Sequence, residues 1–332
     1  MAKIWNVLVT GGAGYVGSAL VPALLDAGHK VTVLDLYLYG EEVLSGVRGH
    51  PGLREVRGDL RDADTVVRAL QGCNAVIHLA CISNDPSFEL NPELGASINH
   101  RAFLPLVRAA KAAGVERFIY ASSSSVYGVK SEPEVTEDLP LEPLTDYSRF
   151  KALCEAELAA EREPGFVTCT LRPSTVCGYA PRQRLDVIVN ILTNQATHRG
   201  KLTVLGGDQK RPNIHIQDMV ACYLDLLQQP AGLIDGEIFN VGYENHTVRE
   251  LAEIVRLTVG PHVGIDVQPT NDPRSYHVSS AKIAAKTGFV CRRTIAEAVQ
   301  DLHAALTDGR LPESLTDSRY FNIRKMQEVS LT

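Results

Sequence analysis

The first half of the chain alternates short apolar runs with segments of helical periodicity. Apolar runs occur at NVLVT (6–10), KVTVLD (30–35), REVRG (54–58), NAVIHLA (74–80), RFIYAS (117–122) and VTCTLRP (167–173). Between them the pattern predicts helices over residues 15–27, 63–71, 98–113 and 147–161. Apolar strands separated by helices are typical of a parallel sheet that is covered on both faces. The predicted fold class is therefore α/β, a doubly wound parallel sheet.

This alternation loosens after residue 172. Glycine and proline become frequent, and runs such as KLTVLGG (201–207) and EIFNVG (237–242) are interspersed with helical segments. A chain of 332 residues is long enough for two units. We expect a first domain over residues 1–172 and a smaller lobe over 173–332, with elements near 216–242 returning to the first domain.

Composition limits the partners that the chain can have. The chain is 45% apolar and 22% charged, which is typical of a globular protein, and its net charge is −6 with Lys and Arg scattered. This charge pattern predicts neither a nucleic-acid nor a membrane partner. The opening MAKIWNVLVTGG resembles neither a secretory signal nor a spanning helix, so we expect a cytoplasmic protein.

The seven cysteines form no CxxC pair and no Cys/His spacing suited to a metal. An odd number of cysteines also argues against a disulfide framework. We therefore interpret them as small buried side chains and expect no metal site.

A glycine-rich turn follows the first predicted strand in VLVTGGAGYVGSAL, with Gly11, Gly14 and Gly17 opening the first helix. Glycine permits a tight turn, lets backbone N–H groups approach a pyrophosphate and allows close packing of helix on sheet. Together with the strand before it and the helix after it, the turn predicts a Rossmann domain that binds a dinucleotide.

The second strand ends at Asp35, eighteen residues beyond Gly17. A carboxylate at this point accepts hydrogen bonds from the adenosine ribose hydroxyls, and its charge repels a 2′-phosphate. No arginine follows among the next three residues. The sequence thus favours NAD over NADP as the cofactor.

Tyr147 and Lys151 lie four residues apart at the start of a predicted helix and therefore share one face. A phenol has an unperturbed pKa of about 10, so losing its proton near neutral pH requires a nearby cation. Lys151, one turn away, can supply that positive charge. In a chain with a dinucleotide fold, this pair indicates proton transfer to or from a substrate hydroxyl.

The glycine turn, Asp35, a serine before VYG (126–128) and the Tyr147/Lys151 pair together resemble the extended short-chain dehydrogenase/reductase family. The resemblance is to its nucleotide-sugar epimerase and dehydratase branch, which includes UDP-glucose 4-epimerase-like enzymes, and it runs from residue 6 to about 289. It implies an NAD-dependent enzyme whose smaller C-terminal lobe binds a nucleotide-diphosphate sugar. It also implies a homodimer, paired through the helices predicted at 98–113 and 147–161.

The resemblance implies roles for particular residues. The cofactor-binding residues would be Gly11, Gly14, Tyr15, Val16, Gly17, Asp35, Asp59, Leu60, Leu79, Ala80, Asn99, Tyr147 and Lys151. The catalytic residues would be Ser123, Tyr147 and Lys151. The substrate-binding residues would be Ser83, Ser123, Thr175, Asn190, Thr203, Val204, Leu205, Arg211 and Arg274, with the two arginines suited to a diphosphate because a guanidinium presents a fork of donors.

Four serines stand in ASSSSVYG (121–128), and the family's active hydroxyl matches Ser123. The next two positions carry Asp and Glu in sugar 4,6-dehydratases, where these carboxyl groups remove water, but here they are Ser124 and Ser125. A hydroxyl is a poor general acid or base near neutral pH, so dehydration is disfavoured. We therefore expect a nucleotide-sugar epimerase that acts at C4 through a keto-sugar intermediate.

Two alternatives remain open: a nucleotide-sugar 4-ketoreductase or related oxidoreductase, and a protein that binds NAD without catalysis. Three departures from the family pattern leave the sugar undetermined. Ser83 stands where galactose epimerases often carry lysine, INHRAF (98–103) replaces the commoner N-x-x-G-T, and Ser174 and Thr175 replace an aromatic residue and an asparagine.

Overall fold

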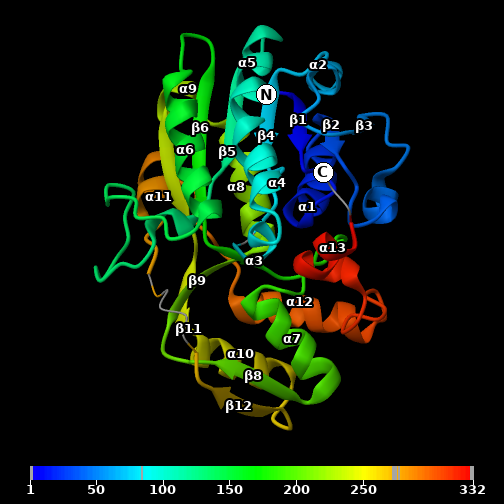
Figure 1. Cartoon of the computed structure of the whole chain (residues 1–332), viewed down its shortest axis with the longest axis vertical. Helices are drawn as coiled ribbons and strands as arrows, with labels where there is room; N and C mark the ends of the chain where they lie inside the picture. The colour runs from blue at the N-terminus through cyan, green and yellow to red at the C-terminus, as the bar shows by residue number, and fades with distance from the viewer. Residues whose placement is uncertain (1–2, 84, 271–274, 276, 330–332) are drawn as a thin grey trace.

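A parallel sheet of seven strands forms the centre of the fold, in the order β10-β6-β5-β4-β1-β2-β3 (Figure 1). The computed structural model describes residues 3–83, 85–270, 275 and 277–329. The strands are Asn6–Thr10 (β1), Lys30–Asp35 (β2), Leu53–Arg57 (β3), Ala75–His78 (β4), Arg117–Ala121 (β5), Val167–Pro173 (β6) and Glu237–Val241 (β10). The predicted doubly wound α/β fold is confirmed.

The order of the strands reverses beside β1. The chain runs outward from β1 through β2 to β3, then crosses to β4 on the other side of β1 and continues to β5 and β6. In such a sheet the carboxyl ends of the two strands at the reversal leave a crevice between their loops, which is where ligands bind. The fold thus places a binding crevice at the ends of β1 and β4.

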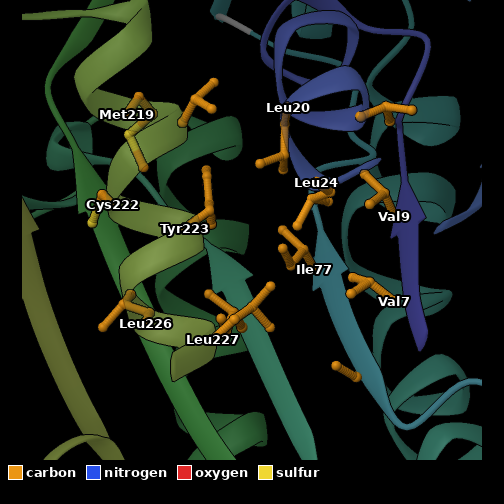
Figure 2. Packing of buried hydrophobic residues seen from close by; sticks show 14 of the residues in the cluster. Val7, Val9, Leu20, Leu24, Ile77, Met219, Cys222, Tyr223, Leu226 and Leu227 are labelled. Carbon is orange, nitrogen blue, oxygen red and sulfur yellow. The ribbon is translucent and has the colours of Figure 1, made fainter. Parts of the chain in front are cut away.

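Helices cover both faces of this sheet. One face carries α1 (Tyr15–Asp26), α8 (Ile216–Gln228) and α11 (Ala281–Thr287). Figure 2 shows α1 and α8 meeting over β1 and β4, with Leu20 and Leu24 facing Tyr223 and Leu227. The other face carries α2 (Ala63–Leu70), α5 (Phe103–Ala112) and α6 (Asp146–Ala160).

The helix predicted over 98–113 differs in one respect from expectation, since a π-helical turn, Ser97–Arg101 (η2), precedes α5. Periodicity at 3.6 residues cannot show such a turn. The turn holds Asn99, whose side-chain amide accepts a hydrogen bond from the Ile82 backbone N–H and donates one to the Ile82 carbonyl, at 2.8 and 2.9 Å. The side chain of Asn99 therefore fastens the loop that follows β4.

A second lobe is built around α7 (Ile188–Arg199), α10 (Val248–Val259) and α12 (Ile295–Thr307). These helices pack with a two-stranded sheet, β8 (Lys201–Leu205) and β12 (Gly264–Gln268). A three-stranded sheet of β7 (Thr175–Cys177), β9 (Lys210–His215) and β11 (Glu244–Thr247) lies between this lobe and the main sheet (Figure 1). The chain thus visits the main sheet again through α8 and β10.

The remaining helices are short. They are η1 (Glu41–Val47), α3 (Asp85–Glu89), α4 (Pro92–Ala96), η3 (Ser124–Tyr127), α9 (Ala231–Ile234), η4 (Ser318–Tyr320) and α13 (Asn322–Glu328). Figure 1 shows α13 near the start of α1, below the carboxyl ends of the sheet strands. Across the described part of the chain, none of the helices has the length and apolar character that crossing a bilayer requires.

Candidate active site

A cleft of about 390 Å³ opens at the carboxyl ends of the sheet strands, where the strand order reverses. Most residues that the sequence singled out line it: Gly11, Gly14, Tyr15, Val16, Gly17, Asp35, Asp59, Leu60, Leu79, Ala80, Ser83, Ser123, Tyr147, Lys151 and Thr175. They come from the ends of strands β1 to β6 and from the first turns of α1 and α6. The fold therefore gathers into one cavity residues that lie up to 164 positions apart in the chain.

The glycine turn between β1 and α1 has no room for side chains. Gly11 has φ +75°, and a Cβ there would lie 2.7 Å from the backbone nitrogen of Ala80. A Cβ on Gly17 would lie 2.4 Å from the Gly11 carbonyl oxygen. Helix α1 begins at Tyr15 with no side-chain hydrogen bond at its N-cap, Gly14. The first turn of α1 thus presents its N–H groups to the cleft, which suits a phosphate anion.

Asp35 ends β2 with its carboxylate held in place. It accepts hydrogen bonds from the Ala13 and Tyr37 backbone N–H groups, at 2.9 and 2.8 Å. Burial raises the pKa of this carboxyl group above its usual value. Each oxygen keeps a lone pair for a further donor, so the group can accept hydrogen bonds from ribose hydroxyls.

Tyr147 and Lys151 lie on the first turns of α6 and both reach the cleft. The Lys151 Nζ donates a hydrogen bond to the Ala121 carbonyl oxygen at 2.6 Å and lies 5.9 Å from the centre of the Tyr147 ring. Lys151 is only 4% exposed, so its charge acts in a poorly solvated place. This arrangement brings a buried cation next to a phenol at the mouth of the cleft.

Ser123 follows β5 and caps the 3₁₀ helix η3. Its Oγ accepts a hydrogen bond from the Ser125 backbone N–H at 3.1 Å and lies 2.9 Å from the Ser125 Oγ. Ser122 points elsewhere and bonds the Glu155 carboxylate of α6. All four serines contribute to the lining of the cleft, and the hydroxyls of Ser123 and Ser125 bond each other just after the end of β5.

Six of the predicted cofactor- and substrate-binding residues that the structure describes lie outside the cleft lining: Asn99, Asn190, Thr203, Val204, Leu205 and Arg211. Val204 is buried in the core of the second lobe, whereas Leu205 is 55% exposed. The Thr203 N–H bonds the Gln195 side chain, and the Arg211 guanidinium bonds the Lys210 carbonyl oxygen. Arg274 lies outside the described residues.

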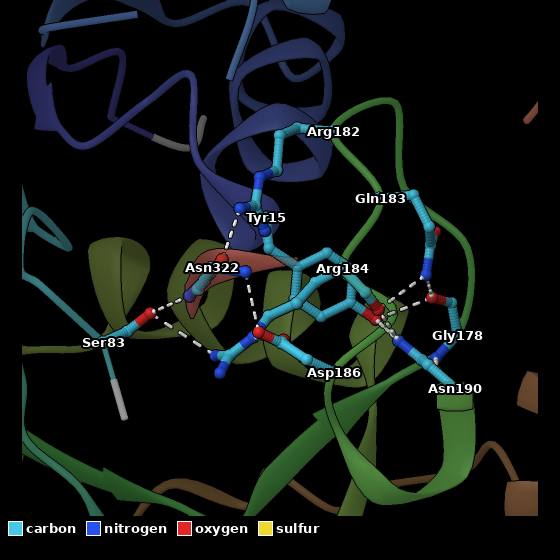
Figure 3. A network of polar contacts seen from close by, with 9 residues as sticks. All are labelled: Tyr15, Ser83, Gly178, Arg182, Gln183, Arg184, Asp186, Asn190 and Asn322. Carbon is cyan, nitrogen blue, oxygen red and sulfur yellow. Dashed lines mark hydrogen bonds and ion pairs between the residues drawn. The ribbon is translucent and has the colours of Figure 1, made fainter. Parts of the chain in front are cut away.

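Asn190 also lies behind the cleft wall and is fully buried. Its side-chain oxygen accepts the Gly178 N–H at 2.9 Å, and its amide donates to the Tyr15 hydroxyl at 3.0 Å and to the Arg184 carbonyl at 2.8 Å (Figure 3). These bonds join the loop after β7 to helix α1. The structure therefore places Asn190 in the framework that supports the cleft.

Two arginines that the sequence analysis did not select line the cleft, Arg182 and Arg184. The Arg182 guanidinium lies 3.5 Å above the Tyr39 ring, and burial lowers its pKa to about 10, so it keeps its charge at neutral pH. Arg184 pairs with Asp186 at 2.6 Å. The sequence signal for both was the segment APRQR, two arginines in a loop just after a strand. Both arginines place a guanidinium group in the lining of the cleft.

A family model described as the NAD dependent epimerase/dehydratase family matches residues 7–242. The chain belongs to this family. The protein therefore uses NAD as its cofactor. The glycine turn, the uncapped start of α1 and the Asp35 carboxylate are consistent with this cofactor.

Similar proteins include both epimerases and dehydratases. A UDP-glucose 4-epimerase from Mycolicibacterium smegmatis is 33% identical over 265 residues, covering 77% of this chain and 83% of the relative. The structure of DesIV, a dTDP-glucose 4,6-dehydratase from Streptomyces venezuelae with NAD bound, is 27% identical, with a TM-score of 0.83 and coverage of 93% and 99%. MoeE5 in complex with UDP-glucose and NAD is 30% identical, with a TM-score of 0.77 and coverage of 94% and 100%.

A metal centre was not expected from the sequence. Within the residues that the structure describes, no group of three or more His, Cys, Asp or Glu side chains is placed to hold a metal ion. None of the described cysteines forms a disulfide, and Cys177 is fully buried beside Ile214.

Proposed function

We propose that the chain is a nucleotide-sugar epimerase that inverts a sugar carbon, C4, through a keto-sugar intermediate. The observation that carries this proposal is the position of Ser123, Tyr147 and Lys151 around one end of a cleft whose other end fits a dinucleotide. Family membership supports an NAD-dependent enzyme of the epimerase/dehydratase class.

The proposed chemistry divides between the cofactor and the three side chains. When bound, NAD supplies the acceptor and donor of a hydride. Tyr147, as a phenolate, takes the proton of the sugar hydroxyl as its carbon is oxidised. The positive charge of Lys151 stabilises that phenolate, and the Ser123 hydroxyl holds the same sugar oxygen by a hydrogen bond.

Inversion needs no further catalytic group in this proposal. The keto sugar must turn so that its other face is presented before the carbon is reduced. Tyr147 then returns the proton to the same oxygen, and the enzyme is left as it began. Because oxidation and reduction alternate within one turnover, the overall reaction consumes no cofactor.

The position of the carboxylates in the described lining of the cleft argues against dehydration. These carboxylates belong to Asp35 and Asp59. Asp35 ends β2, and Asp59 follows β3 and pairs with Arg61 at 2.6 Å, so both lie on the side of the sheet away from Tyr147. Ser124 and Ser125 stand where dehydratases would place a carboxylic acid and a carboxylate. A site without an acid and a base beside the sugar is poorly suited to the removal of water.

A nucleotide-diphosphate sugar is the substrate that we propose. The guanidinium of Arg184, which lies in the cleft lining, suits a cleft that must accept pyrophosphate groups. The names of the relatives support UDP sugars as the first candidates, since one is a UDP-glucose 4-epimerase and MoeE5 was solved with UDP-glucose. The roles that the sequence assigns to the lining residues are part of the same proposal.

The alternative function is a nucleotide-sugar 4-ketoreductase, which the same three side chains could serve. The two differ in how they use the cofactor. An epimerase retains NAD and needs no added nicotinamide, whereas a reductase consumes a reduced nicotinamide for every product molecule.

We also propose that the chain works in the cytoplasm as a homodimer paired through α5 and α6.

The test begins with the protein as purified. Its bound nicotinamide is extracted and quantified, and the protein is then incubated with UDP-glucose and UDP-galactose without added cofactor. Conversion of either sugar into the other supports the proposal, and Tyr147→Phe should lower the rate by roughly 100-fold or more. If neither these sugars nor a wider panel of UDP-, GDP- and TDP-sugars is inverted, the epimerase proposal fails.

A further inference from the structure

Helix α13 supplies a wall of the cleft that no sequence motif indicated. Its residues Asn322 and Met326 line the cavity, together with the glycine turn and the ends of β2, β3 and β4. Asn322 is 2% exposed, although it lies on a short helix at the edge of the fold. The helix is therefore attached to the cleft by specific contacts.

Asn322 bonds three residues that belong to two loops of the chain (Figure 3). Its Nδ2 donates to the Ser83 Oγ at 2.8 Å, and its Oδ1 accepts from the Arg182 guanidinium at 2.5 Å. Its backbone N–H donates to the Asp186 carboxylate at 2.8 Å. Ser83 belongs to the loop after β4, whereas Arg182 and Asp186 belong to the loop between β7 and α7. Asn322 thus closes one side of the cleft by joining the two loops.

Met326 extends an apolar cluster in the same region. It packs against the group formed by Ile82, Leu94, Ile98 and Leu60. Of these, Leu60 and Ile82 line the cleft, as does Ile98. An apolar slot bounded by a thioether and aliphatic side chains is suited to the flat face of a nucleobase.

These contacts lie at the adenosine end of the cleft. Leu60 follows β3, and Arg182 stacks on Tyr39, which follows β2. Strands β2 and β3 form the side of the sheet that also carries Asp35, whose carboxylate suits ribose hydroxyls. The catalytic candidates stand on the other side, after β5 and on α6.

We propose that Asn322 and Met326 are part of the NAD site. Met326 covers the adenine face, and Asn322 holds Arg182 and the Ser83 loop closed against the adenosine half of the cofactor. The inference rests on the use of NAD and not on the reaction that follows. NAD can then leave only when the bonds of Asn322 open, which makes α13 a determinant of how long the enzyme keeps its cofactor.

The experiment measures cofactor release and affinity in three variants of the full chain. Met326→Ala and Asn322→Ala test the two contacts, and Gln327→Ala is the matched control because Gln327 is an exposed neighbour on the same helix. NAD release from the purified holoprotein is followed after dilution into excess ADP-ribose. Affinity for ADP-ribose, which is NAD without its nicotinamide and so keeps the adenosine half, is measured by calorimetry on cofactor-stripped protein.

We expect Met326→Ala and Asn322→Ala each to weaken ADP-ribose binding by about tenfold and to speed NAD release by a similar factor, because each removes a contact of ordinary strength. Gln327→Ala should match the parent protein. The melting temperature of each stripped variant checks its fold, and if Asn322→Ala does not fold, Met326→Ala decides the outcome. Parental affinity and release in a folded Met326→Ala protein would overturn the proposal. Failure of the epimerase proposal looks different, since NAD would then bind tightly while no sugar is inverted.

Discussion

The Lys151 Nζ donates a hydrogen bond to the backbone carbonyl of Ala121, with 2.6 Å between the two atoms. This bond ties the start of α6 to the last residue of β5, two positions before Ser123. One turn further along α6, the Glu155 carboxylate bonds the Ser122 hydroxyl. The distance between the helix that carries Tyr147 and the serine segment is thus set by two direct contacts.

Replacing Lys151 with methionine should remove both the bond to Ala121 and the positive charge beside Tyr147. We expect kcat to fall by roughly 100-fold or more, because the phenol loses the cation that stabilises its ionised form. Steady-state kinetics of sugar inversion measure the effect. Lys111→Met is the control, since Lys111 pairs with Glu161 away from the cleft. If Lys151→Met kept the parental rate, Lys151 would have no role in proton transfer.

Glu155 and Arg172 form an ion pair that is almost fully buried, at 2.6 Å with side chains 4% exposed. Glu155→Gln leaves the Arg172 charge without its partner, so we expect the free energy of unfolding to fall by about 3–5 kcal/mol. Urea denaturation measures this change. Glu116→Gln, which breaks an exposed pair with Lys3, should cost less than about 1 kcal/mol. Equal losses in the two variants would contradict the interpretation.

Gly11→Ala should damage cofactor binding through a steric contact. The added Cβ would meet the Ala80 backbone nitrogen at 2.7 Å, at a residue whose φ is +75°. We expect NAD affinity to fall by more than about tenfold, because the turn must shift away from the pyrophosphate. Gly114→Ala is the control, because Gly114 has nearly the same backbone angle as Gly11, φ +78°, but its added Cβ would have no neighbouring atom within 4 Å. That variant should lose some stability from strain and keep its affinity for NAD.

His78 is buried at the end of β4, with its Nδ1 2.7 Å from the Thr10 hydroxyl. Burial, aided by the nearby charge of Lys151, lowers the pKa of His78 to about 3. Between roughly pH 6.5 and 3 the unfolded chain therefore binds a proton that the folded chain does not, and this group makes stability fall as the pH falls, by about 1.4 kcal/mol per pH unit.

The measurement for His78 is the free energy of unfolding at several pH values from 7 to 5. His78→Asn should show a shallower loss on acidification than the parent protein, even if it is less stable at pH 7. His50→Asn, at an exposed position, should leave the slope unchanged. A parental slope in His78→Asn would show that other groups govern acid stability.

Local motifs made much of the fold and cleft predictable from the sequence. The glycine turn, Asp35 and the Tyr147/Lys151 pair each depend on residues close together in the chain, and the structure places all of them in the cleft. Asn190 was harder to place, because whether its amide faces a ligand or Tyr15 depends on how the loop after β7 folds back on α1.

Contacts between distant segments could not be predicted. Asn322 meets Ser83 across 239 positions of sequence, and nothing in the polar segment around it indicates that contact. The same holds for Arg182, which reaches Tyr39 from the loop after β7. A wall of the cleft that depends on such contacts becomes visible only when the chain is folded.

The most direct test of the proposed epimerase uses a nucleotide sugar that carries deuterium on C4. The purified protein is incubated with the labelled sugar without added nicotinamide, and the product is examined by NMR spectroscopy. We predict an inverted C4 that retains the deuterium, because the hydride that leaves the carbon returns to the same carbon from the bound cofactor. Loss of the label to solvent, or no inversion without a stoichiometric supply of reduced nicotinamide, would contradict the proposal.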